Sequence, residues 1–321
     1  MVRWLARRLL LSLLLVVTVS SAALMLTRLA PGDVTTQLGL FAKPVELAAT
    51  RARFDLDRPA LVQWGLWVSR AVRLDLGTSF LYNRPVSEMI GRAAWNSAIL
   101  AAAALTVTTL LGIPLGVFTG YRTGLATSII KAAALLCVSM PPLLMSMLLL
   151  FVAARTGWFP AGGMSSSASI DASWAAWLVD VAWHLPLPTL ALALPMAATL
   201  ERLQSQSMSE AMRQPFLVAA AARGVSPRRV LLRHAWPAAL RPVCAVYGMT
   251  VGALLSGSFV VEYVTTWPGL GRLMYEALRA RDIYLVAGCA ATGAGFLAIG
   301  TLVGDLLLAA IDPRVREGIE A

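Results

Sequence analysis

Charged residues are scarce in this chain of 321 residues. Asp, Glu, Lys and Arg make up 14% of it and apolar residues 58%, and the mean hydropathy is +0.71. Soluble domains carry roughly 25% charged residues. The composition therefore excludes an ordinary soluble protein and indicates an integral membrane protein. The formal net charge of +10 then belongs to loops that flank the membrane, and it does not indicate nucleic-acid binding.

Lysine and histidine are rarer still, and their absence excludes several kinds of chemistry. Only Lys43 and Lys131 are present, and neither follows a glycine. A GxxxxGK[ST] phosphate-binding loop is therefore impossible, and any ATP that drives this protein must be bound by another chain. The sequence also lacks HExxH and GxSxG motifs, and its two histidines, His184 at a predicted membrane edge and His234 in the basic island 201–242, are expected on opposite faces of the membrane. We expect neither a histidine-based metal site nor a catalytic nucleophile.

The three cysteines and the acidic residue inside a predicted span do not indicate another functional site. Cys137, Cys244 and Cys289 each fall inside a predicted span without CxxC spacing, which argues against disulfides and metal ligation. Asp305 is the one clear ionisable residue inside a span, and capping or interhelical bonding explains it better than a proton relay. A proton-coupled secondary transporter and an intramembrane enzyme stay as alternatives, but neither finds the residue constellation that it needs.

The chain instead contains several long apolar runs. A membrane span needs roughly 20 apolar residues, and Pro and Gly within such runs are tolerated where protein or a cavity satisfies the backbone. Small residues such as Gly112 and Gly116 allow close helix contact. The runs predict an all-α polytopic membrane protein. The six expected spans are Leu9–Thr27, Ala98–Thr119, Ala132–Ala154, Val181–Leu200, Val243–Val261 and Ile283–Ile311.

The distribution of basic residues predicts the orientation. The N-terminus, the short islands around Arg122 and 201–242, and the C-terminal tail carry fourteen Arg and Lys, against four in the short loops opposite. Cytoplasmic loops are the basic ones, so both termini should be cytoplasmic. The first apolar run lacks a prompt cleavage site and should be a retained helix. The expected segments are 1–29 (N-terminus and first helix), 30–97 (extracytoplasmic), 98–311 (transmembrane core) and 312–321 (cytoplasmic tail).

The basic island at 201–242 looks structured. Helix-forming residues run from Glu210 to Arg223, and Gly224 then offers a positive-φ stop. Ser226-Pro227 supplies an N-cap and a first-turn proline for a second short helix that should end at Trp236. A helix, glycine turn and helix on a membrane face suit a groove on a soluble partner, although a plain positive-inside anchor is the alternative.

This stretch resembles the cytoplasmic EAA loop of permease subunits in binding-protein-dependent ABC importers, in particular the first permease of the dipeptide/oligopeptide/nickel family. Further similar blocks are RLAPGD (28–33), FDLDRPALVQWGLWV (54–68), LDLGTSF (74–80), VVEYVTTWPGLGRLMYEALRARDIYLV (260–286) and GDLLLAAIDPRVR (304–316). Phe216 and Pro215 depart from the tyrosine and aspartate that are usual in the loop.

The resemblance implies a type I ABC importer permease fold with six transmembrane helices, without enzymatic activity of its own. It implies a bacterial inner-membrane location, a second homologous permease, two ATPase subunits that bind ATP and Mg, and an extracytoplasmic solute-binding protein. No cofactor is expected in this chain. The expected ATPase-coupling residues are Glu210, Ala219, Ala222, Arg223, Gly224, Arg228, Arg229 and Arg233.

On the other side of the membrane, the loop 262–282 is too apolar for a solvated loop and too broken for a span. We expect a scoop-like or re-entrant element at the mouth of the pathway, with a helical piece from Leu273 to Ala280. The expected gate residues are Glu262, Trp267, Pro268, Gly269, Gly271, Arg281 and Asp282.

The substrate is less well indicated than the machinery. The resemblance implies short peptides, and nickel or another metal chelate is the alternative, since TRARFDLDRP (50–59) resembles nickel-importer permeases. In this family selectivity resides largely in the binding protein, so the permease sequence does not decide between the two.

Overall fold

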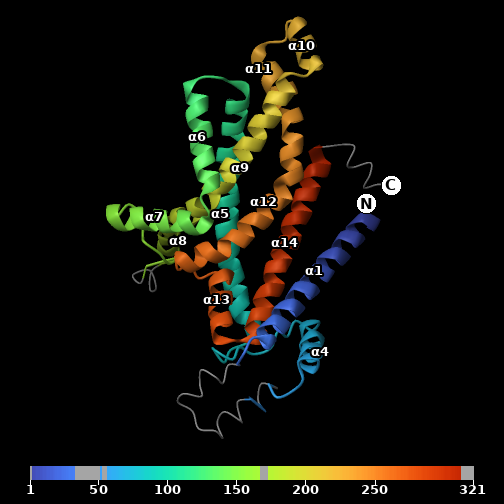
Figure 1. Cartoon of the computed structure of the whole chain (residues 1–321), viewed down its shortest axis with the longest axis vertical. Helices are drawn as coiled ribbons and strands as arrows, with labels where there is room; N and C mark the ends of the chain where they lie inside the picture. The colour runs from blue at the N-terminus through green and yellow to red at the C-terminus, as the bar shows by residue number, and fades with distance from the viewer. Residues whose placement is uncertain (1, 33–50, 53–55, 167–172, 312–321) are drawn as a thin grey trace. The chain divides into compact units, whose positions relative to one another are not determined.

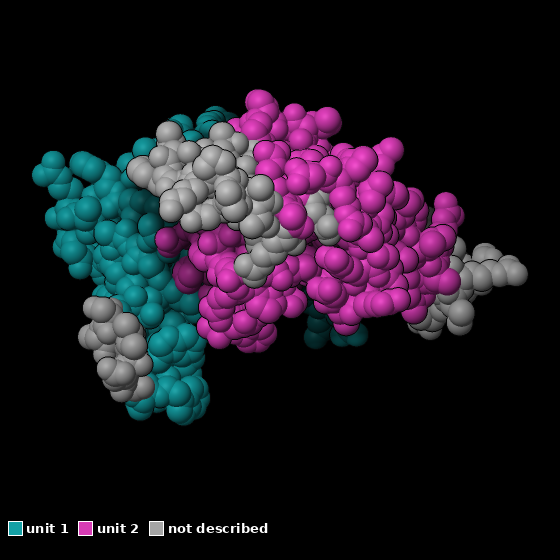
Figure 2. All heavy atoms as spheres, turned by 90° about the horizontal axis from the view of Figure 1, so that it is seen from below, with its two compact units in different colours: residues 1, 99–267, 299–321 teal, residues 2–98, 268–298 magenta. Residues whose placement is uncertain are grey.

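The computed structural model shows a helical protein (Figure 1). It describes residues 2–32, 51–52, 56–166 and 173–311, so the predicted tail 312–321 lies outside the described residues. Within those ranges no residue belongs to a strand, and Thr78 and Pro85 form one isolated bridge. The predicted all-α class is confirmed. The chain forms two compact units, coloured separately in Figure 2: 99–267 with 299–321, and 2–98 with 268–298.

Among the described helices, four are long and apolar enough to cross a membrane, and two bent helix pairs bring the number of spans up to six if each pair is one span. The described helices are α1 (Val2–Leu29), α4 (Ala60–Ala71), α5 (Val86–Tyr121), α6 (Leu125–Ser139), α7 (Pro142–Thr156), α8 (Trp174–His184), α9 (Pro186–Met212), α10 (Pro215–Ala222), α11 (Pro227–Arg229), a π-helical segment (Val230–Ala235), α12 (Trp236–Val264), α13 (Leu270–Ala280) and α14 (Ile283–Ile311).

The third predicted span, Ala132–Ala154, is divided between two helices. The chain breaks at Met140, which is extended, and α6 and α7 meet at a bend of 108°. The Pro141-Pro142 pair explains the break, because proline cannot donate a backbone hydrogen bond and disfavours a helical residue before it. The fourth predicted span, Val181–Leu200, is likewise divided, with α8 and α9 bent by 42° just before Pro186.

Two helix ends also differ from the sequence prediction. Helix α5 begins at Val86, twelve residues before the predicted Ala98, and it runs for 36 residues. The charged residues of this stretch, among them Glu88, hid the helix from a search for apolar runs. Helix α13 begins at Leu270, one turn before the predicted Leu273.

Helix α9 organises the larger unit. Its buried residues pack with those of α5, α7 and α12 in an apolar core that includes the fully buried Trp267. Three glycines of α5 face the α9 backbone. A Cβ added to Gly112 would lie 2.8 Å from the Ala197 carbonyl oxygen, and one added to Gly116 would lie 2.6 Å from that of Glu201. Small residues at four-residue spacing let two helix backbones approach closely. We call this contact the α5–α9 seam.

The smaller unit packs α1 against α4, and the indole N–H of Trp64 donates to the Ser21 hydroxyl at 2.8 Å. The second turn of α14 packs as closely against the start of α5. A Cβ added to Gly288 would lie 2.5 Å from the side chain of Ile90. This unit therefore fixes α13 and α14 against the N-terminal turns of α5.

Candidate functional site

The predicted coupling loop (201–242) is divided by a helix break just before Pro215. Glu210 lies on the last turn of α9, which ends at Met212, and α10 starts separately at Pro215. The prediction of one helix from Glu210 to Arg223 is therefore wrong. Proline has no N–H and its ring disfavours a helical conformation at Gln214 before it, and both effects favour the end of α9 at this point.

Gly224 takes the conformation that the sequence predicted. Its φ is +80°, a region that residues with a Cβ enter only at a cost. The Val225 N–H donates to the Ala220 carbonyl across the turn at 3.3 Å. A Cβ at Gly224 would meet no atom within 4 Å. The requirement for glycine here is therefore one of backbone conformation and not of space.

The second helix of the loop starts as predicted but does not end at Trp236. Ser226 has N-cap dihedral angles, and its carbonyl accepts from the Val230 N–H at 3.0 Å. From Pro227 the chain passes through the π-helical segment and continues as α12 to Val264. Pro237 near the start of α12 lacks the N–H of a regular turn. The wider π-helical turn before it carries the helix on without a stop.

A small apolar cluster holds the coupling loop together. Its buried members include Met208 and Ala211 on α9, Leu217 on α10, and Val230 and Ala235 beyond the turn. This packing leaves the predicted arginines outside, because Arg223, Arg228, Arg229 and Arg233 are all exposed. Glu210 and Ala222 are exposed as well, and Ala219 is half-buried. The structure thus brings the predicted coupling residues together on one solvent-facing element of the larger unit.

The predicted gate residues do not form one such element. Glu262 and Trp267 are fully buried in the larger unit, whereas residues 268–282 belong to the smaller unit. Pro268 is exposed, and Gly269 is the extended residue before α13. Gly271 is buried in the first turn of α13. Arg281 has a φ of +56° and ends α13 in the left-handed conformation.

Asp282, at the start of α14, accepts several hydrogen bonds. One carboxylate oxygen accepts from the Ser79 hydroxyl at 2.6 Å and the Phe80 N–H at 2.7 Å. The other accepts from the Leu285 N–H at 3.1 Å, as an N-cap of α14 does. Burial raises the pKa of Asp282, while the bond from Ser79 lowers it. Asp282 therefore fixes the segment 79–81 to the α13–α14 junction.

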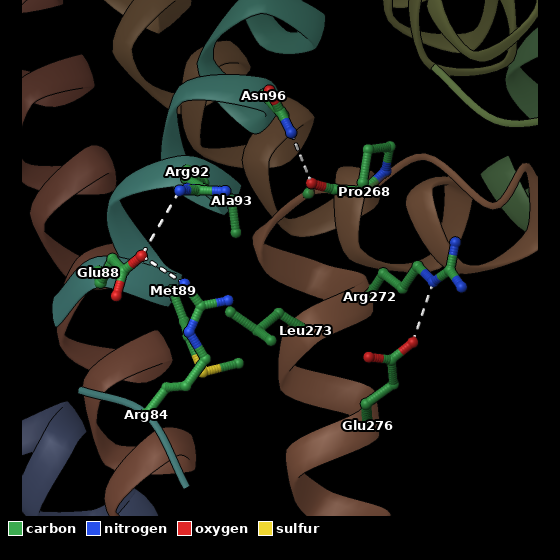
Figure 3. Close-up of a pocket in the computed structure, with 11 residues that line it drawn as sticks. Arg84, Glu88, Met89, Arg92, Ala93, Asn96, Pro268, Arg272, Leu273 and Glu276 are labelled. Atoms are coloured by element: carbon green, nitrogen blue, oxygen red, sulfur yellow. Dashed lines mark hydrogen bonds and ion pairs between the residues drawn. The ribbon is translucent and has the colours of Figure 1, made fainter. Parts of the chain in front are cut away.

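A pocket of about 420 Å³ lies between the start of α5 and α13 (Figure 3). Glu88 stands between two arginines, at 2.5 Å from Arg84 and 3.5 Å from Arg92. On α13, the Arg272 guanidinium is 3.0 Å from the Glu276 carboxylate. Each wall of the pocket thus carries charges of both signs, and each glutamate is already paired.

Two further contacts order this pocket. The Asn96 amide donates to the Pro268 carbonyl at 2.8 Å, which ties the first residues of the α13 segment to α5. The Tyr82 hydroxyl donates to Glu276 at 2.6 Å. Burial and this bond raise the pKa of Tyr82 to about 12, so the hydroxyl stays protonated and keeps donating at neutral pH.

Sequence reasoning missed the pocket residues on α5. Their signal was the four-residue spacing of Arg84, Glu88 and Arg92, which places alternating charges on one helix face. That spacing indicates a helix, but it does not reveal which distant element the face meets.

Comparison with known proteins assigns the family. Residues 112–317, which contain the predicted coupling loop, match the family described as binding-protein-dependent transport system inner membrane component. The chain is 32% identical over 325 residues to the oligopeptide transport system permease protein OppB of Mycobacterium tuberculosis, covering 98% of this chain and 99% of the relative.

Two Brucella proteins are similar to the chain at the same level. A Brucella ovis protein, provisionally named a peptide permease, is 32% identical over 325 residues, with 98% of this chain and 99% of the relative covered. A Brucella abortus protein, provisionally named a peptide transport system permease, is 36% identical over 296 residues, covering 91% of this chain and 92% of the relative. The chain therefore belongs to the inner-membrane components of binding-protein-dependent transport systems, which are permease subunits of ABC importers and not enzymes.

Proposed function

We propose that this chain forms half of the translocation pathway of an ATP-driven importer for short peptides. A second homologous permease supplies the other half, two ATPase subunits bind ATP and Mg, and a solute-binding protein delivers the peptide from outside. The relatives that match almost the whole chain carry peptide and oligopeptide permease names. Those names favour peptides over nickel or a metal chelate.

The coupling loop carries the mechanistic part of the proposal. Its apolar side is fixed to the end of α9, and its exposed side presents α10, Gly224 and the arginines. Such an element can sit in a groove of an ATPase and move with it. Because α9 is also packed along α5 in the seam, a displacement of the loop is passed to helices of the transmembrane core. Coupling of this kind needs an element that can take two positions. Both the ATPase and the transmembrane helices must shift the balance between these positions.

The orientation follows from the same assignment. The coupling loop and both termini lie in the cytoplasm, in agreement with the excess of basic residues there. The segment with α13 and its pocket then lies outside. The paired charges of Arg84, Glu88 and Arg272 suit a polar surface that meets the solute-binding protein.

Uptake into vesicles tests the proposal. The two permeases and the ATPases are reconstituted with ATP inside, and the partner binding protein is added outside with a labelled di- or tripeptide. We expect peptide accumulation that requires both ATP and the binding protein. Radioactive nickel, offered with the same components, serves as the comparison. Accumulation of nickel without peptide would assign the alternative substrate, and uptake that persists without the ATPases would refute the ABC importer mechanism.

A further inference from the structure

A second polar pocket lies in the larger unit, between α6 and α9, and the transport function does not account for it. Its volume is about 520 Å³. Three basic side chains line it: Lys131 from α6, Arg202 from α9, and Arg213 just after α9. None of the three makes an ion pair or side-chain hydrogen bond with the described part of the chain. The pocket therefore holds three cations that are not paired with the two carboxylates, Glu201 and Glu210, that also line it.

The acidic residues of the pocket are already engaged. The Glu201 carboxylate accepts a hydrogen bond from the Thr119 hydroxyl of α5 and is almost completely buried. Glu210 accepts from the Gln206 amide at 3.0 Å. Two hydroxyl groups, Ser205 and Ser209, add donors to the lining. Together with the free cations, these donors match the oxygens of a phosphate group.

The surface beside the pocket indicates where the phosphate comes from. Lys131 is the one charged residue of α6, whose sequence is otherwise apolar or neutral. Large apolar side chains of the same helix are exposed, namely Leu125 at 79%, Ile129 at 59% and Leu136 at 69%. Leu135, also exposed, lines the pocket itself. In a membrane protein an exposed apolar surface of this kind suits acyl chains, and a lysine on it can direct its ammonium group towards the headgroups.

We propose that this pocket binds the headgroup of an anionic phospholipid, with Lys131 and Arg202 contacting the phosphate and α6 contacting the acyl chains. Zwitterionic lipids leave the excess positive charge uncompensated, so the site discriminates by charge. The site adjoins Glu210 and Arg213 at the end of α9, and a bound lipid therefore stabilises the base of the coupling loop. The inference does not depend on the transported substrate.

The test uses the complete importer in nanodiscs of phosphatidylcholine, with or without phosphatidylglycerol, and measures retained lipid by native mass spectrometry. Each Lys or Arg near a membrane surface strengthens the binding of anionic lipid about fivefold. The double variant Lys131→Gln/Arg202→Gln should thus bind phosphatidylglycerol roughly thirty-fold more weakly. The double variant Arg70→Gln/Arg73→Gln removes the same charge from two exposed residues outside the pocket, and it should retain lipid like the wild type.

A charge-retaining variant, Lys131→Arg/Arg202→Lys, should bind phosphatidylglycerol like the wild type. It shows whether the weaker binding of the double variant comes from the lost charge or from misfolding. Equal retention of phosphatidylglycerol by the wild type and Lys131→Gln/Arg202→Gln would overturn the proposal. Displacement of the lipid by inorganic phosphate would also overturn it, because the pocket would then recognise a free anion. Loss of the ATPase subunits from the double variant would assign the cations to a protein partner instead.

Discussion

Two regions of the larger unit depend on glycine for opposite reasons. In the α5–α9 seam, Gly116 has ordinary helical geometry but no room, because a Cβ would lie 2.6 Å from both the Glu201 carbonyl oxygen and the Gln204 Cβ. In the coupling loop, Gly224 has ample room, with no atom within 4 Å of an added Cβ, but its φ is +80°. A side chain at Gly116 is excluded by steric contact with α9, whereas a side chain at Gly224 is disfavoured by the backbone conformation. Substitutions should therefore damage folding in the first region and coupling in the second.

The largest effect is expected from Gly116→Ala. The added methyl group forces α5 and α9 apart, and overpacking of this kind costs about 1–3 kcal/mol or more. Thermal unfolding of the purified permease complex, followed by circular dichroism, should show a clearly lower Tm and a poor yield. Gly91→Ala is the matched control, since it lies on the same helix with nothing within 4 Å of its Cβ. Equal Tm values for the two variants would show that the seam tolerates separation.

Thr119→Val tests the polar part of the seam. The Thr119 hydroxyl donates to the buried Glu201 carboxylate, whose other oxygen has no partner among the described atoms. Loss of the donor leaves this carboxylate still less satisfied, at a cost of about 1–3 kcal/mol. Thr106→Val on the same helix is the control, because its exposed hydroxyl bonds only to the Ala102 carbonyl of its own helix. A Tm decrease no larger than that of the control would show that Glu201 finds another donor.

In these two regions, the sequence predicts the features that neighbouring residues determine, and it does not predict those that depend on residues distant in the chain. The positive φ of Gly224 was predicted because it follows from neighbouring residues, with helix formers before it and Ser226-Pro227 after it. The small residues of the second span predicted close helix contact, but not that α9 is the partner of Gly116. That pairing depends on residues distant in the chain. The partners of Asp282 are a further case, since Ser79 lies about two hundred residues before it.

The helix breaks were only partly predictable for a related reason. Proline within the spans was expected, but the 108° angle at Pro141-Pro142 depends on the packing of α7 against α9 and α12. The end of α9 before Pro215 follows from local proline chemistry, and the prediction failed because the run of alanines after it was given more weight. Local proline chemistry thus places the breaks, whereas long-range packing sets the direction of the helices.

Gly224→Val should leave the seam intact and damage coupling. A β-branched residue at a φ of +80° costs about 1–2 kcal/mol, and the cost falls on a solvent-facing turn rather than on the core. We expect a smaller decrease in Tm than for Gly116→Ala, with ATP hydrolysis that no longer responds to the loaded binding protein. Gly224→Asn should be milder, because asparagine enters the left-handed region more readily. If the valine variant transports peptide like the wild type, the turn has no coupling role.

The smallest effect on folding, and the sharpest on docking, is expected from Arg228→Glu/Arg229→Glu. Both side chains are exposed and outside the apolar cluster of the loop, so the Tm should not change. If the two guanidinium groups face acidic residues of the ATPase, charge reversal weakens the association of the subunits. The loss should be greatest at low ionic strength, because salt screens exposed charges. Copurification of the ATPases across a salt series measures this, with Arg70→Glu/Arg73→Glu as the charge-matched control. Normal copurification at every salt concentration would mean that these arginines only anchor the loop to the membrane surface, and that Gly224 and α10 alone distinguish the coupling loop from an ordinary basic loop.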